Sequence, residues 1–139
     1  MTESHSEVLA EVRSLALADR RARDQLARRS GYGRAVWDVL SAVGQSDGGT
    51  VPQIGRRLGV SRQSVQRVAD GLVDKRLAHY EVNPDHQRSP RLRLTPSGEQ
   101  TLRSLDRAAA ASEPDLEQDF EPEEIETALY VLRALREAL

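Results

Sequence analysis

Residues 51–70, VPQIGRRLGVSRQSVQRVAD, have the spacing of two short helices joined by a tight turn. Gly55 provides the small residue that two crossing helices need where they touch, and Gly59 suits the turn because glycine adopts a left-handed backbone easily. Ser61 is a preferred N-cap for the second helix. The apolar residues expected to fill the space between the helices are Ile54, Leu58, Val60, Val65 and Val68. The stretch therefore predicts a helix-turn-helix.

The polar face of the second helix carries side chains that suit DNA. Arginine and glutamine read guanine and adenine edges in a major groove, and arginine and serine also bind phosphates. Their place in the N-terminal half of the helix matches how recognition helices dock. The residues expected to contact DNA from this helix are Ser61, Arg62, Gln63, Ser64, Gln66 and Arg67. A solvated helix face explains any one of them, but it explains the whole pattern poorly.

Two stretches with strand-like alternation follow, at 77–83 (LAHYEVN) and 91–95 (RLRLT), and the polar segment 83–90 separates them. They predict a β-hairpin, and a helix-turn-helix followed by a hairpin is a winged helix. Arg88 in the hairpin loop is expected to enter a minor groove, whose negative potential attracts arginine. Arg91 on the second strand is a further predicted DNA contact. The alternative for Arg88 is a surface arginine without a partner.

The net charge of −2 conceals a strong segregation of charge along the chain. Residues 13–107 carry 18 basic and 10 acidic residues, whereas residues 1–12 and 108–139 are acidic. A basic middle predicts an anionic partner for that part of the chain. Residues 113–126 hold eight acidic residues and no basic one. A solvated connector explains this stretch, and the alternative is repulsion that keeps the ends of the chain away from DNA phosphates.

The rest of the chain is predicted to be mostly helical. Apolar spacing indicates a long helix over 6–29 and, after the SGYG break at 30–33, a second helix. Residues 44–50, GQSDGGT, are a loop by composition. The Thr-Pro pair at 95–96 starts another helix, and the last one begins near Pro122. The fold class is therefore mainly α (α+β), with a winged helix-turn-helix at its centre.

The two ends of the chain are amphipathic helices that have no second core of their own. They need a partner surface, and a second copy of the chain related by twofold symmetry would provide it. We therefore expect dimerisation helices at 1–33 and 99–139, on either side of a DNA-binding region at 34–98. The two recognition helices of such a homodimer would lie about 34–36 Å apart and read a palindromic operator in double-stranded DNA.

Several classes of site are unsupported by the sequence. Cysteine is absent, which excludes disulfides and thiolate metal sites, and three scattered histidines make a metal site improbable. There is no apolar run of about 18 residues and no signal-peptide pattern, so we expect a cytoplasmic protein without a membrane partner. There is no nucleophile elbow or phosphate loop. We expect no cofactor and no enzymatic activity; a winged helix used for protein contact is the main alternative to DNA binding.

The stretch QIGRRLGVSRQSVQRVADGLVDKRL, followed by NPDHQRSPRLRLTPSG, resembles the MarR family of bacterial transcription regulators. The most specific feature is the LTxxG run that ends the hairpin, made of Leu94, Thr95 and Gly98. The resemblance implies a winged-helix homodimer in which both chain ends interlock. It also implies a repressor of nearby genes that a small aromatic or phenolic acid, such as a salicylate-like compound, releases from DNA.

The sequence departs from the family pattern at two places. An aspartate usually stands two residues before the wing arginine, where this chain has His86, although Asp85 is adjacent. The family often has glycine where Arg76 stands. His86 would make wing binding sensitive to pH if it titrated against DNA, and an ordinary loop histidine is the alternative.

Three residues are candidates for binding an effector. Arg20 would counter the charge of a carboxylate ligand, and Tyr32 and Trp37 would line a pocket between the helices and the DNA-reading part. The ordinary explanations are a solvated helix face for Arg20, a helix boundary for Tyr32 and a core position for Trp37.

Overall fold

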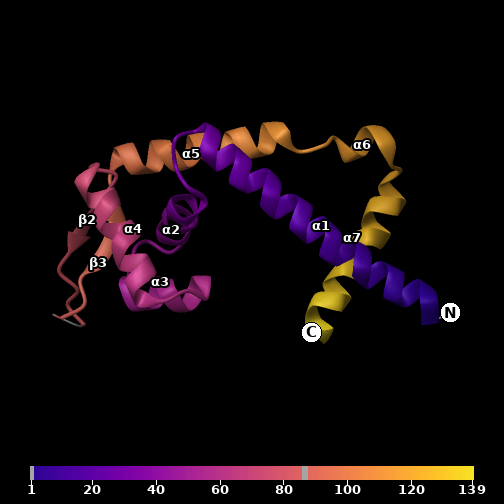
Figure 1. The fold of residues 1–139 in the computed structure, drawn as a ribbon, viewed down its shortest axis with the longest axis horizontal. Helices are drawn as coiled ribbons and strands as arrows, with labels where there is room; N and C mark the ends of the chain where they lie inside the picture. The colour runs from indigo at the N-terminus through magenta and orange to yellow at the C-terminus, as the bar shows by residue number, and fades with distance from the viewer. Residues whose placement is uncertain (1, 86–87) are drawn as a thin grey trace.

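The computed structural model describes residues 2–85 and 88–139. Seven helices and three short strands are present in these residues, and Figure 1 shows their arrangement. In chain order they are α1 (Thr2–Arg29), α2 (Arg34–Gln45), β1 (Gly49–Thr50), α3 (Val51–Leu58), α4 (Arg62–Asp74), β2 (Ala78–Glu81), β3 (Arg91–Leu94), α5 (Pro96–Ser112), α6 (Leu116–Asp119) and α7 (Pro122–Ala138). The predicted fold class, mainly α with a small β element, is confirmed.

The three strands form one antiparallel sheet in the order β1-β3-β2. The predicted hairpin is present, with Tyr80 on β2 opposite Leu92 on β3. The prediction of a loop over residues 44–50 was wrong at both ends, because α2 continues to Gln45 and Gly49–Thr50 pairs with β3. Composition alone did not reveal β1, since its partner strand lies some forty residues further along the chain.

The helix-turn-helix consists of α3 and α4, and local signals set its boundaries. The Thr50 side chain accepts a hydrogen bond from the Gln53 backbone N–H, and the Gln53 side chain accepts one in return from the Thr50 N–H. Gly59 ends α3 with a φ of 69°. A Cβ atom on Gly55 would lie 3.0 Å from the Val60 carbonyl oxygen, which confirms the need for a small residue at the crossing.

The corner between β3 and α5 explains the LTxxG run. The Thr95 side chain caps α5 by accepting from the Gly98 N–H, and its hydroxyl donates to the Arg76 carbonyl oxygen at 2.6 Å. A Cβ atom on residue 98 would lie only 1.9 Å from the Leu77 carbonyl oxygen. Position 98 therefore requires glycine, because the backbone of Leu77, which follows the recognition helix, leaves no room for a side chain.

The core lies between α2, α3, α4, the sheet and the start of α5. Its fully buried large side chains are Leu40, Val43, Ile54, Val65, Leu72 and Leu92. The prediction that Val60 fills the space between α3 and α4 was wrong, since its side chain is 47% exposed. Val60 lies in the turn, where its backbone occupies the gap beside Gly55 and directs the side chain outward.

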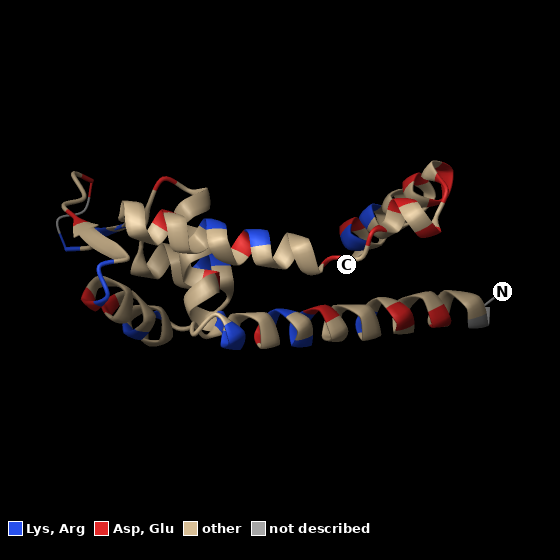
Figure 2. Cartoon of the chain, turned by 90° about the horizontal axis from the view of Figure 1, so that it is seen from above, with Lys and Arg blue, Asp and Glu red and all other residues tan. Residues whose placement is uncertain are grey.

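The N-terminal part of α1 (residues 2–22), α6 and α7 lie away from this core, and we call them the helical arms (Figure 1). The compact unit formed by residues 34–98 is the winged head. Several apolar side chains of the arms are exposed, among them Val8, Leu15, Leu129, Val131 and Leu132. Figure 2 shows acidic residues concentrated over α6 and the start of α7. No helix in the described part of the chain is long and apolar enough to cross a membrane.

Candidate nucleic-acid interface

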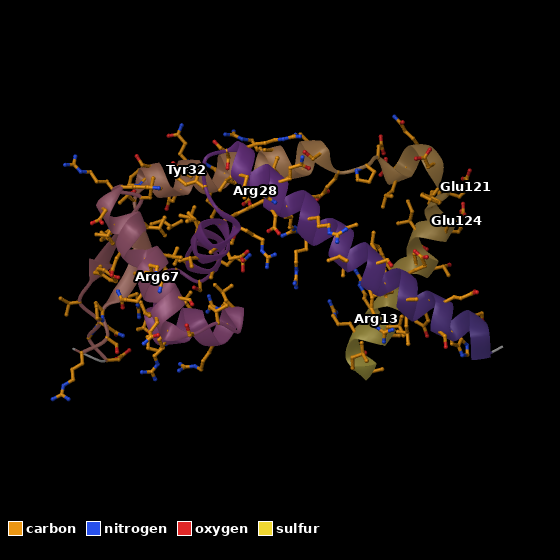
Figure 3. All side chains as sticks on the ribbon, viewed as in Figure 1. Arg13, Arg28, Tyr32, Arg67, Glu121 and Glu124 are labelled. Atoms are coloured by element: carbon orange, nitrogen blue, oxygen red, sulfur yellow. The ribbon has the colours of Figure 1, made fainter. Side chains whose placement is uncertain are left out.

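Helix α4 has one buried and one exposed face, as a recognition helix requires. Val65 and Ala69 are almost fully buried against the rest of the winged head. The six polar residues predicted to contact DNA are all exposed, namely Ser61, Arg62, Gln63, Ser64, Gln66 and Arg67. Figure 3 labels Arg67 on this helix. None of these side chains belongs to the core, so they remain available to a partner.

Residues of α4 and of the wing line one groove with a volume of about 490 Å³, which we call the α4–wing groove. Arg62, Gln63 and Gln66 line it from α4, and Arg88 lines it from the wing. The structure therefore brings together four of the eight predicted DNA-contacting residues. The other four, Ser61, Ser64, Arg67 and Arg91, lie outside its lining.

Ser61 and Ser64 have a structural role at the start of α4. The Ser61 hydroxyl accepts a hydrogen bond from the Ser64 N–H at 3.1 Å and donates to the Ser64 hydroxyl at 2.9 Å. Both residues stand at the positive end of the helix dipole, where anions are favoured. This end of α4 is thus chemically suited to a phosphate, with the capping hydrogen bond already formed.

A hydrogen-bonded triangle links α4 to β2. The Gln66 Nε2 donates to Asp70 Oδ1 at 2.9 Å and to Tyr80 Oη at 2.8 Å, and the Tyr80 hydroxyl donates to the same Asp70 oxygen at 3.0 Å. Burial raises the pKa of Tyr80, and the hydrogen bond and charge of Asp70 raise it further. Neither Asp70 nor Tyr80 was predicted from the sequence to belong to this site. The four-residue spacing of Gln66 and Asp70 was the available signal.

The arginines of the wing differ in how they are held. Arg93 lies between two carboxylates. Its Nη1 is 2.8 Å from Asp47 Oδ1, and its Nε forms an ion pair with Glu81 Oε2 at 2.5 Å, although the angle of this contact is not that of a hydrogen bond. Arg91 is half-buried, and the aliphatic part of its side chain lies against the Gly48 backbone. Arg88 is exposed, and no ion pair holds it within the described residues. The predictions for His86 fall outside the described residues.

A second cavity, of about 640 Å³, lies where α1 ends against α5. Tyr32, one of the three effector candidates, lines it, and Lys75 Nζ lies 5.4 Å from the centre of the Tyr32 ring. Arg29 lines it as well and was not predicted. Figure 3 shows Tyr32 near the junction of α1 and α2.

Arg20 and Trp37, the other two effector candidates, do not line this cavity. Arg20 is exposed on α1. Trp37 is 6% exposed, and its indole N–H donates to Asp106 Oδ1 at 3.1 Å. The Arg23 guanidinium lies 5.9 Å from the Trp37 ring centre. These positions agree with the ordinary explanations, a solvated helix face for Arg20 and a core position for Trp37.

The sequence of the chain is similar to those of known proteins. The family model described as "MarR family" matches residues 30–89. The uncharacterized protein Rv2011c of Mycobacterium tuberculosis is 39% identical to this chain over 140 residues, which covers 100% of the chain and 96% of the relative. The uncharacterized protein Mb2034c of Mycobacterium bovis gives the same values.

Solved structures extend the match to the whole fold. The crystal structure of a MarR family transcription regulator has a TM-score of 0.86 and 25% identity, covering 98% of this chain and 90% of the other. A Staphylococcus aureus MepR mutant bound to an oligodeoxyribonucleotide has a TM-score of 0.63 and 20% identity, with coverage of 94% and 96%, and supports the fold alone. With the winged head, the LTxxG corner and these matches together, the chain belongs to the MarR family of winged-helix transcription regulators.

Proposed function

We propose that the chain is a homodimeric, sequence-specific DNA-binding repressor that a small aromatic or phenolic acid releases from a palindromic operator. The observation that carries the DNA-binding part is the α4–wing groove, where exposed Arg62, Gln63 and Gln66 on α4 face the same space as Arg88 on the wing. In this arrangement α4 enters a major groove and Arg88 reaches the neighbouring minor groove. The MepR structure, whose fold is similar, was obtained with an oligodeoxyribonucleotide bound.

The helical arms support the homodimer. Apolar side chains of α1 and α7 line a groove of about 630 Å³ between the two helices, including Val8, Leu15, Val131 and Leu132. These side chains remain substantially exposed in the single chain, and burying apolar surface contributes about 25 cal/mol per Å². A second copy that covers these faces would place two recognition helices across a symmetry axis.

The cavity at the end of α1 supports release by a small acid. Its volume of about 640 Å³ falls in the usual range for small-molecule sites. Tyr32 offers an aromatic ring and Arg29 a guanidinium, which together suit an aromatic carboxylate. Leu77, just before the wing, and Ser104, on α5, also line the cavity. A bound acid would therefore contact the winged head and the helices that lead to the arms, and so bias their relative position.

The decisive experiment is selection of bound fragments from a random pool of duplex DNA by the purified full-length chain. We expect a palindromic motif whose affinity falls steeply as salt rises, because phosphate contacts release counterions. A winged helix used for protein contact would recover no motif. A cytoplasmic location and a lack of enzymatic activity go with the proposal, since the family consists of transcription regulators.

Substitutions then separate the roles of wing and helix. Arg88→Ala should weaken binding to every sequence and reduce the salt slope by about one. Gln63→Ala should cost about 1–3 kcal/mol and blur the preference at the base that it contacts. Fluorescence anisotropy on the recovered operator and on scrambled duplexes measures both. Wild-type affinity in both variants would show that the α4–wing groove does not face DNA.

The homodimer has its own test. Leu132→Glu places a charge on the apolar face of α7 and should shift the chain from dimer to monomer in sedimentation, with weaker operator binding at equal concentration. Glu126→Gln, a change on an exposed acidic residue of the same helix, is the control. A wild-type chain that sediments as a monomer at micromolar concentration would contradict the homodimer.

A further inference from the structure

The structure assigns a defined direction to one side chain of the recognition helix. The Gln66 amide has its nitrogen end held by Asp70 and Tyr80, so its nitrogen and oxygen ends are not equivalent. We propose that Gln66 acts as a hydrogen-bond acceptor that reads a base amino group, and that Asp70 and Tyr80 are the positioning residues that set this specificity. The inference rests on the proposed DNA-binding function.

Chemistry fixes which end of the amide faces the triangle. The carboxylate of Asp70 only accepts hydrogen bonds, and it already accepts the Tyr80 hydroxyl proton at 3.0 Å. An amide turned by 180° would place Gln66 Oε1 against the Asp70 oxygen, which repels it. Nε2 therefore faces Asp70, and Oε1 is the end of the amide that is left for a partner.

The triangle lies at the surface where DNA is expected. Gln66 and Tyr80 both line the α4–wing groove, together with Arg62 and Gln63. Tyr80 belongs to β2, so the triangle also ties the recognition helix to the wing. The orientation of the Gln66 side chain is therefore set from both the recognition helix and the wing.

Major-groove chemistry then names the target. Adenine presents its N6 amino group and cytosine its N4 amino group, whereas guanine and thymine present only acceptors for hydrogen bonds in that groove. An amide oxygen pairs with the first two and not with the others. Asp70 itself carries negative charge on a DNA-facing helix, which weakens attraction to phosphates. Its contribution is therefore to specificity rather than to affinity.

The experiment starts from the operator recovered by the selection described above. Gln66→Ala identifies the base pair that Gln66 reads, because the preference at that pair should fall from roughly tenfold to about twofold. The amino group of that pair is then removed, with purine in place of adenine or 2-pyrimidinone in place of cytosine. Wild-type affinity should drop by roughly tenfold, and the affinity of Gln66→Ala should stay within about twofold.

Asp70→Ala tests the positioning role, with Asp74→Ala as the matched control. Both changes remove one exposed carboxylate from α4, but only Asp70 holds Gln66. Asp70→Ala should relax the preference at the Gln66 pair to about twofold and leave the other pairs unchanged. Asp74→Ala should keep it. Tyr80→Phe, which leaves Asp70 in place, should give an intermediate loss and serves if Asp70→Ala folds poorly.

The outcomes separate this inference from the proposed function. A recovered operator with no base pair sensitive to Gln66→Ala would overturn the inference and leave DNA binding intact. Insensitivity of the wild type to removal of the amino group, or an unchanged preference in Asp70→Ala, would overturn it as well. Failure to recover any operator would instead contradict the proposed function.

Discussion

The winged head and the helical arms contain the same kinds of apolar residue but bury them to very different extents. In the head, Leu40 and Leu72 are at most 1% exposed. In the arms, Leu15 is 65% exposed and Leu132 is 43% exposed. The head is thus complete within one chain, whereas the arms present faces that one chain does not cover. A region can be helical and amphipathic and still lack its packing partner.

The largest expected effect comes from making the same substitution in both regions. Leu40→Ala should lower the free energy of unfolding by about 2–5 kcal/mol, because a fully buried leucine leaves a cavity. Leu132→Ala should change it by less than about 1 kcal/mol in dilute solution, where there is little partner to cover the residue. Urea unfolding at low and high protein concentration measures both values.

Leu139→Ala is the control for this pair, since Leu139 is 98% exposed. At high concentration Leu132→Ala should become more destabilising, because dimerisation is linked to folding. If Leu132→Ala destabilises the dilute chain as much as Leu40→Ala does, then the arms find their packing within a single chain and the contrast disappears.

A smaller effect concerns backbone contacts inside the head. Gly98→Ala should destabilise the chain by about 1–3 kcal/mol, because the new methyl group would meet the Leu77 carbonyl and force the β3–α5 corner apart. Gly71→Ala is the matched control. A Cβ atom there has no neighbour within 4 Å, and alanine in a helix should stabilise by about 0.5–1 kcal/mol. Thermal unfolding that ranks the two variants in the opposite order would refute the role given to Gly98.

Features of the head that depend on neighbouring residues were predictable from sequence. The glycines at 55 and 59 and the cap at Ser61 mark the helix-turn-helix within a dozen residues, and Thr95 marks the start of α5 in the same way. Each is a local requirement of the backbone, so the sequence expresses it locally. The exposed polar face of α4 followed from the same periodicity.

Features that depend on distant contacts were not predictable. Strand β1 exists only because β3 pairs with it. The orientation of Gln66 depends on Tyr80, a residue from the next element. Arg29 rather than Arg20 reaches the cavity because the docking of α1 on α5 decides which side of the helix faces inward. Periodicity identifies a face, but tertiary packing decides what that face meets.

The smallest expected effect is on the pH dependence of stability, and it is measured by replacing one tyrosine in each region. Burial and Asp70 raise the pKa of Tyr80 in the folded chain above its usual value of about 10. The neutral phenol is therefore favoured by folding, so its contribution to stability is present below about pH 10 and is lost as pH rises through the raised folded pKa. Tyr130 on α7 is 76% exposed and has no such partner among the described residues.

Tyr80→Phe should therefore be less stable than the wild type by about 1 kcal/mol at neutral pH, the usual contribution of such hydrogen bonds. This difference should shrink above about pH 10, because the Tyr80 phenol then ionises more easily in the unfolded chain than beside Asp70 in the folded chain. The free energy of unfolding of the wild type therefore falls, whereas that of Tyr80→Phe does not respond to this group. Tyr130→Phe removes the hydroxyl of an exposed tyrosine and is the control. Unfolding by urea between pH 7 and about pH 11 gives the three curves. A Tyr80→Phe difference that stays constant over this range would mean that neither burial nor Asp70 raises the pKa of Tyr80 in the folded chain. It would also weaken the case that the same carboxylate orients Gln66.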